Sequence, residues 1–94
     1  MRYSYTTDFG QLMVEVDQRN LPNLHLSLHT WGPETIRKCR KCFEDVKAKL
    51  AARGYSRLIA CMKEEEVKLH KLPRMFGMKE AVRKDGIVVF LLEI

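Results

Sequence analysis

The sequence predicts an α+β domain in which a twisted mixed sheet of five to six strands carries two main helices. Three observations predict it: alternating apolar and polar residues near the N-terminus, an apolar stripe of helical spacing in the middle, and apolar runs beside an Asp-Gly pair near the C-terminus. At 94 residues and 11.0 kDa, the chain is expected to form one domain over residues 1–94. The expected order is strand, strand, strand, helix, strand, helix, strand, strand.

Three strands are expected in the first 29 residues. Apolar residues alternate with polar ones over 3–7, 12–17 and 24–29, the pattern of half-buried strands. Turns are expected at 8–10 and 19–23, where glycine, asparagine and proline interrupt the alternation. The leucines of the third strand would face the core, so His25 and His29 would share the opposite face.

A basic amphipathic helix is expected over 34–53. Pro33 suits the first helical turn, Glu34 complements the positive end of the helix dipole, and Gly54 would end the helix. Apolar residues recur at helical spacing from Ile36 to Leu50, and lysines and arginines occupy the opposite face.

The C-terminal part predicts a buried strand, a second helix and a hairpin. The apolar run 58–62 is short enough for a central strand, parallel to its neighbour across the helical crossover. Acidic residues at 64–66 would begin the second helix, and Pro73 would kink it or end its regular part. Asp85 and Gly86 supply the positive φ angles of a tight hairpin turn before 87–92. The inner face of the second helix would carry Val67, Leu69, Leu72 and Phe76.

The same periodicities predict which side chains form the core. The predicted core residues are Ile36, Phe43, Val46, Leu50, Leu58, Ile59, Leu72, Phe76, Val89 and Leu91. Cys39 and Cys42 also lie on the apolar stripe of the helix, so they are expected to be core residues and no metal site is predicted.

Composition narrows the class of protein. Hydrophobic residues are 46% of the chain and charged residues 31%, which excludes a disordered tail, a collagen-like fibre and a coiled coil. No apolar run approaches the roughly 18 to 20 residues of a membrane-spanning helix, and the first residues lack the apolar stretch of a secretory signal. We therefore expect a cytoplasmic protein with no membrane partner, and three reduced cysteines without a disulfide framework.

The positive charge of the chain is concentrated in one segment. Lys and Arg number 17 against 12 Asp and Glu, a net charge of +5, and residues 34–57 alone hold eight basic and three acidic side chains. This excess predicts an anionic partner, such as nucleic acid or an acidic protein surface. The expected partner-binding residues are Arg37, Lys38, Arg40, Lys41, Lys47 and Lys49.

Two stretches of the chain resemble the GNAT acetyltransferase superfamily. Residues 24–54 are similar to the family's cofactor-binding strand-to-helix segment, and residues 61–94 to its late helix and final hairpin. With the family's two early helices missing, the chain looks most like the small GNAT-like proteins of short-tailed bacteriophages. That likeness implies a location in a host cytoplasm or a virion. The string that carries it best is Leu69-His70-Lys71-Leu72-Pro73-Arg74-Met75-Phe76-Gly77-Met78.

At the positions where the family has its functional residues, this sequence has other residue types. Family members bind the pyrophosphate of acetyl-CoA with a glycine-containing loop at a helix N-terminus, but Arg37 and Cys39 stand where the glycines belong. Pro33 also lacks an amide to donate. Pro73 stands in place of the tyrosine that would protonate the departing thiolate of CoA. The resemblance therefore implies a scaffold without catalytic residues or a cofactor.

The expected function is that of a non-catalytic protein-binding or structural factor, which binds an acidic protein surface through its basic helix. One alternative is a minimal acetyl-CoA-dependent N-acetyltransferase, in which Arg37, Lys38 and Arg40 would attract the cofactor phosphates. His25 or His29 would then act as the general base, oriented by Glu15 or Asp17 on the neighbouring strand. A second alternative is a nucleic-acid binder that uses the helix face over 37–53. A homo-oligomer stays open.

Overall fold

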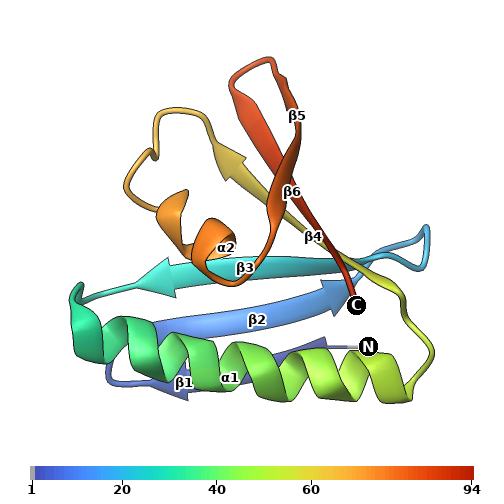
Figure 1. Ribbon diagram of the computed structural model, residues 1–94, viewed down its shortest axis with the longest axis horizontal. Coiled ribbons are helices and arrows are strands. Elements are labelled where there is room, and N and C mark those ends of the chain that lie inside the picture. The colour runs from blue at the N-terminus through green and yellow to red at the C-terminus, as the bar shows by residue number, and fades with distance from the viewer. Residues whose placement is uncertain (1) are drawn as a thin grey trace.

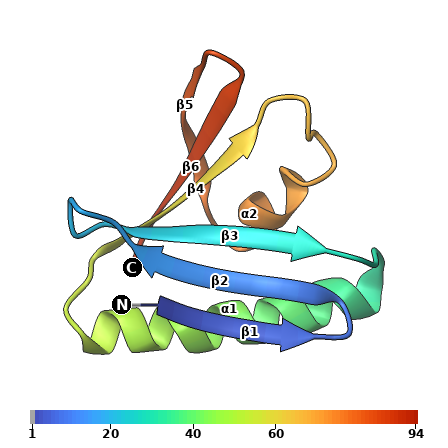
Figure 2. The same cartoon turned by 180° about the vertical axis from the view of Figure 1, so that it is seen from behind.

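Six strands form one mixed sheet, and two helices pack on one of its faces (Figures 1 and 2). The computed structural model describes residues 2–94. The elements are β1 (Arg2–Thr7), β2 (Gly10–Val16), β3 (Pro22–Leu28), α1 (Pro33–Ala52), β4 (Arg57–Lys63), α2 (Lys71–Met75), β5 (Lys79–Lys84) and β6 (Ile87–Glu93). The sheet order is β1-β2-β3-β4-β6-β5, in which β3 and β4 are parallel and the other neighbours antiparallel. The predicted α+β class and order of elements are confirmed.

The alternation in the first three strands places their apolar side chains under α1. Leu12, Val14 and Leu24 are at most 2% exposed, and cross-strand pairing puts Tyr3 and Tyr5 on the same face. Gly10 begins β2 where the chain has no space for a side chain. Its φ is +136°, and a Cβ there would lie 2.0 Å from the carbonyl oxygen of Ser27 on β3. A glycine is therefore required for β2 and β3 to pair at this end.

α1 is the predicted amphipathic helix, one residue longer at its start and one residue shorter at its end. Phe43, Val46 and Leu50 are fully buried beneath it. Ile36 was predicted to be core but is only half-buried, because it lies in the first turn at the margin of the sheet. The Gly54 amide donates to the Ala51 carbonyl at 3.0 Å and closes the last turn. Within residues 2–94, neither helix has the length and apolarity needed to cross a membrane.

The parallel strands β3 and β4 separate after a short contact. They pair only at Asn23 with Ile59 and Leu24 with Ala60. Beyond this point β3 continues beside β2 as far as Leu28, while β4 continues beside β6 as far as Lys63. Figure 1 shows β3 and β4 diverging, with α2 between their open ends. The divergence makes room for the segments that follow each strand.

The second helix is much shorter than predicted. Residues 64–70 form consecutive turns, and α2 spans only Lys71–Met75. Pro73 therefore lies buried within a single helical turn, where its missing amide costs nothing, and it neither kinks nor ends the helix. Val67, predicted to face inward, is 66% exposed. His70 precedes α2, is 3% exposed, and its Nε2 lies 2.8 Å from the Lys63 carbonyl oxygen.

The final hairpin forms as predicted, but the buried face of β6 differs by one residue. Asp85 and Gly86 adopt φ angles of 54° and 78° in the turn. Val88 and Phe90 are fully buried, whereas the predicted core residues Val89 and Leu91 are half-buried on the opposite face. The apolar run 87–92 has no alternation, so only the pairing with β4 selects the face.

Candidate functional site

Part of the predicted basic surface instead attaches α1 to the edge strand β1. Lys38 donates to both carboxylate oxygens of Asp8, at 2.8 and 2.7 Å. Lys49 lies 3.0 Å from Asp45 in an ion pair and donates to the Tyr5 hydroxyl at 3.2 Å. The Tyr5 hydroxyl in turn donates to Asp45. Lys38 and Lys49 therefore hold the helix against β1.

These contacts shift the pKa values of Asp8, Asp45 and Tyr5. The hydrogen bond from Lys38 lowers the pKa of Asp8 below its ordinary value. The hydrogen bond from Tyr5, followed by that from Lys49, lowers the pKa of Asp45. Loss of solvent, followed by the bond to Asp45, raises the pKa of Tyr5. At neutral pH both carboxylates are thus ionised, and the two lysines on this side are compensated.

The other side of α1 carries four basic residues that we call the outer basic face: Arg37, Arg40, Lys41 and Lys47. Arg37 pairs with Glu34, and Lys47 lies 3.0 Å from Glu44. Arg40 donates to the Met75 carbonyl at the end of α2, at 3.4 Å, and Lys41 forms no ion pair with any of residues 2–94. Four cations and two carboxylates leave an excess of two positive charges here. Four of the six residues predicted to bind a partner therefore lie on the outer side of α1, and Lys38 and Lys49 lie on the side next to β1.

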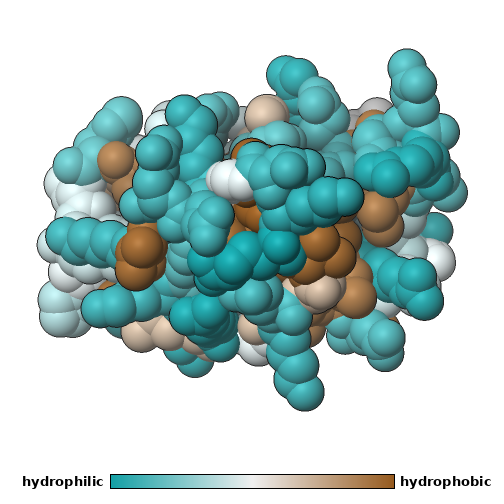
Figure 3. Space-filling view, turned by 90° about the horizontal axis from the view of Figure 1, so that it is seen from above, coloured by the Kyte–Doolittle hydropathy of each residue, from teal (hydrophilic) through white to brown (hydrophobic). Residues whose placement is uncertain are grey.

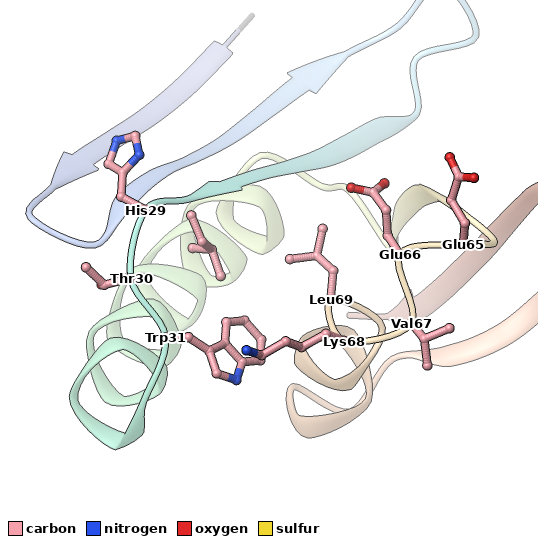
Figure 4. A pocket seen from close by; sticks show the side chains of 9 residues that line it. His29, Thr30, Trp31, Glu65, Glu66, Val67, Lys68 and Leu69 are labelled. Carbon is pink, nitrogen blue, oxygen red and sulfur yellow. The ribbon is translucent and has the colours of Figure 1, made fainter.

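A pocket of about 370 Å³ opens where β3 and β4 diverge (Figure 4). Its walls are the segment after β3 and the turns after β4: Leu28, His29, Thr30, Trp31, Glu65, Glu66, Val67, Lys68 and Leu69. The Lys68 ammonium lies 5.2 Å from the centroid of the Trp31 ring, a cation–π contact that joins the two walls. Sequence reasoning missed this site, because the turns at 64–70 were predicted to be helical.

The residues present at this pocket do not fit acetyl-CoA. Arg37, Lys38 and Arg40, predicted to attract its phosphates, are outside the pocket lining and bind other partners. The lining has two carboxylates, Glu65 and Glu66, against one ammonium, which disfavours an anion. Pro33 removes an amide from the start of α1, beside the pocket. The chain thus lacks a phosphate cradle in this place.

The two histidines proposed as general bases are not assembled into a site. His25 is exposed on the uncovered face of the sheet, opposite Met13. His29 follows β3, and Figure 4 shows its ring directed away from Trp31. Glu15 pairs instead with Arg2 at 2.6 Å, and Asp17 accepts the amides of residues 19 and 21 in the turn before β3. Neither carboxylate hydrogen-bonds to an imidazole.

The cysteines occupy three different environments. Cys39 is buried, and burial raises its thiol pKa to about 11. Cys42 is half-buried, and Cys61 is exposed on β4. Among residues 2–94, no group of three or more His, Cys, Asp or Glu side chains is placed to hold a metal ion.

Comparison with known proteins returned no match: no family model matches the chain, and neither curated proteins nor solved structures show a significant similarity to it.

Proposed function

We propose that the chain is a small non-catalytic binding protein that docks an acidic protein surface through the outer basic face of α1. The observation that carries this proposal is that, in the described part of the chain, some cations of α1 have carboxylate partners within the protein and others have none. Lys38 and Lys49 pair with Asp8 and Asp45 where α1 meets β1 and the turn after it, while Arg40 and Lys41 are exposed and have no carboxylate partner in residues 2–94. A rigid face of this kind accelerates encounter with an acidic surface more than it deepens affinity.

A GNAT-like scaffold is part of the proposal. What supports it is the order of elements and the parallel β3–β4 pair joined through α1, both expected from the sequence. On this proposal the fold persists while the cofactor loop and the late tyrosine have been replaced. The phage-type likeness extends the proposal to a factor that acts on a host protein or within a virion.

The alternative left open by the sequence is acetyl-CoA-dependent N-acetyltransfer. The pocket beside Trp31, at about 370 Å³, has the volume of a small-ligand site, but its two carboxylates disfavour the phosphates of this cofactor. Thermal unfolding with added acetyl-CoA separates the two functions. A ligand at 100 times its dissociation constant adds about 2.7 kcal/mol to the unfolding free energy. We expect no stabilisation, and a clear rise in melting temperature would instead favour the enzyme.

Capture experiments test the binding function. The parent protein and the variant Arg37→Glu, Arg40→Glu, Lys41→Glu are immobilised and exposed to a lysate of the natural host. The matched control reverses three exposed cations that lie outside α1 and outside the strands, Arg19→Glu, Arg53→Glu and Lys71→Glu. We expect a protein retained by the parent and the control but lost from the helix variant. Equal recovery by all three would refute the proposal, and loss after nuclease treatment would favour nucleic acid.

A further inference from the structure

The face of the sheet opposite the helices carries an ordered apolar strip. Strand pairing aligns its side chains in rows across β4, β6 and β5. One row is Cys61, Val89 and Val82; the next pairs Ile59 with Leu91. Ile87 continues the strip toward the hairpin turn. The side chains buried beneath the helices, among them Ala60, Val88 and Phe90, alternate along β4 and β6 with those of the strip, so the strip points away from α1 and α2.

The strip is most accessible at Val82 and Ile87 and less accessible at its centre. Val82 is 53% and Ile87 40% exposed, whereas Val89 and Leu91 are half-buried and Ile59 is 8% exposed. Seen from the end that carries the β5–β6 hairpin, the surface is mostly hydrophilic, with apolar patches between charged side chains (Figure 3). Exposed apolar side chains bordered by polar ones are typical of a protein-interaction site.

Basic residues flank this strip within the sheet, and Glu64 and Glu65 border it beside Ile87 at the hairpin end. Lys63 and Lys84 flank Ile87 in one row, Lys79 lies beside Leu91, and Arg57 pairs across from Glu93. All four cations are exposed, and none forms an ion pair with any of residues 2–94. Four cations against Glu93 leave an excess of three positive charges in these rows.

We propose that this strip and its rim form a second docking surface, which binds an acidic amphipathic segment of another protein. The apolar stripe of the segment would cover the rows from Ile87 to Ile59, and its flanking Asp or Glu side chains would meet the uncompensated cations. Alternate residues of a strand are about 6.8 Å apart, so the four rows extend about 20 Å. A helix of about 14 residues has that length.

The same observations argue against other occupants. A second copy of this face would bring like-charged rims together. The strip has no aromatic side chain on which a base would stack. Its central side chains, Val89 and Leu91, are half-buried, whereas a membrane surface requires apolar groups that protrude. A narrow protein segment can reach them.

The probe for this surface is a fluorescent synthetic helix of about 14 residues with a leucine stripe flanked by glutamates. A scrambled peptide of equal composition and charge controls for the stripe. The rim variant is Lys63→Glu, Lys84→Glu, and the strip variant is Val82→Thr, Ile87→Thr. The matched control, Arg53→Glu, Lys71→Glu, makes the same charge change at two exposed cations that belong to neither proposed surface. Circular dichroism shows whether each variant is folded, and anisotropy measures binding.

We expect the parent and the charge control to bind the amphipathic peptide equally and the scrambled peptide weakly. The rim variant should bind about tenfold less tightly, since two surface charge pairs together are worth about 1 to 2 kcal/mol. The strip variant should also bind less tightly. Equal binding of both peptides, or equal binding by all folded variants, would overturn the proposal. So would dimerisation abolished by the strip variant, or sedimentation with phosphatidylserine vesicles in place of peptide binding. Because α1 is intact in the rim and strip variants, this test is independent of the function proposed above.

Discussion

Replacement of Phe43 by alanine should remove an aromatic contact between α1 and the residue that follows α2. The Phe43 ring is fully buried and stacks on the ring of Phe76, with centroids 4.7 Å apart and planes at 23°. Phe76 is 7% exposed and ends α2, so this contact joins α1 to the C-terminal half of the chain. Truncation of a buried phenylalanine costs about 3 to 5 kcal/mol. The free energy of unfolding of a small domain is about 5 to 15 kcal/mol, so the Phe43→Ala variant should be only marginally stable.

Urea unfolding followed by circular dichroism measures this loss. The milder variants Phe43→Leu and Phe76→Leu should keep the protein folded. Together with the double variant they complete a double-mutant cycle. We expect a coupling of about 0.5 to 1.5 kcal/mol between the two positions, the range for aromatic pairs. If the free energy of unfolding of Phe43→Ala were within about 1 kcal/mol of the parent value, the loss would be too small for a buried ring. That result, or additive effects of the two leucines, would show that α1 faces the sheet differently.

Three further predictions follow from the packing and the ion pairs. Gly10→Ala should strongly destabilise the protein in thermal unfolding, because its Cβ would lie 2.0 Å from the Ser27 carbonyl oxygen; an unchanged melting temperature would contradict this close approach. The pKa values of Asp8 and Asp45 are lower in the folded state than their ordinary value of 3.8, so the stability they contribute is present above pH 3.8 and is lost as pH falls below it. Asp8→Asn should therefore reduce the acid sensitivity measured by urea unfolding at a series of pH values, and an unaltered pH profile would remove the Lys38 contact from the account. Iodoacetamide at mildly alkaline pH should label exposed Cys61 first and Cys39 last, because Cys39 is buried and its thiol pKa is about 11; peptide mass spectrometry gives the order, and early labelling of Cys39 would be inconsistent with a buried α1 stripe.

The elements that the sequence predicts well are those with a strong local signal. The alternation around Leu12 and Leu24 predicts β2 and β3, the apolar stripe through Phe43 predicts α1, and Asp85-Gly86 predicts the hairpin. Prediction fails where the same local sequence pattern is compatible with more than one structure. Acidic residues at 64–66 are typical of a helix start, yet here they lie in turns. The unbroken apolar run of β6 carries no alternation, so its buried face depends on pairing with β4.

The candidate sites depend on contacts between distant residues, which explains why the sequence predicts them incompletely. The basic helix is visible as a pattern, but Lys38 meets Asp8 thirty positions away and Lys49 meets Tyr5 forty-four positions away. Charge counting along the helix therefore overestimates its free surface. The rows formed by Lys63, Ile87 and Lys84 likewise exist only once the register of three strands is set.

Association kinetics with the captured acidic partner test the central claim most directly. Rate constants are measured for the parent and for Arg37→Glu, Arg40→Glu, Lys41→Glu at low and high salt. We predict that the parent associates at least about tenfold faster at low salt, that this advantage shrinks as salt screens the charges, and that dissociation changes little. Equal association rates with the same salt dependence would contradict the claim that the outer basic face of α1 guides binding.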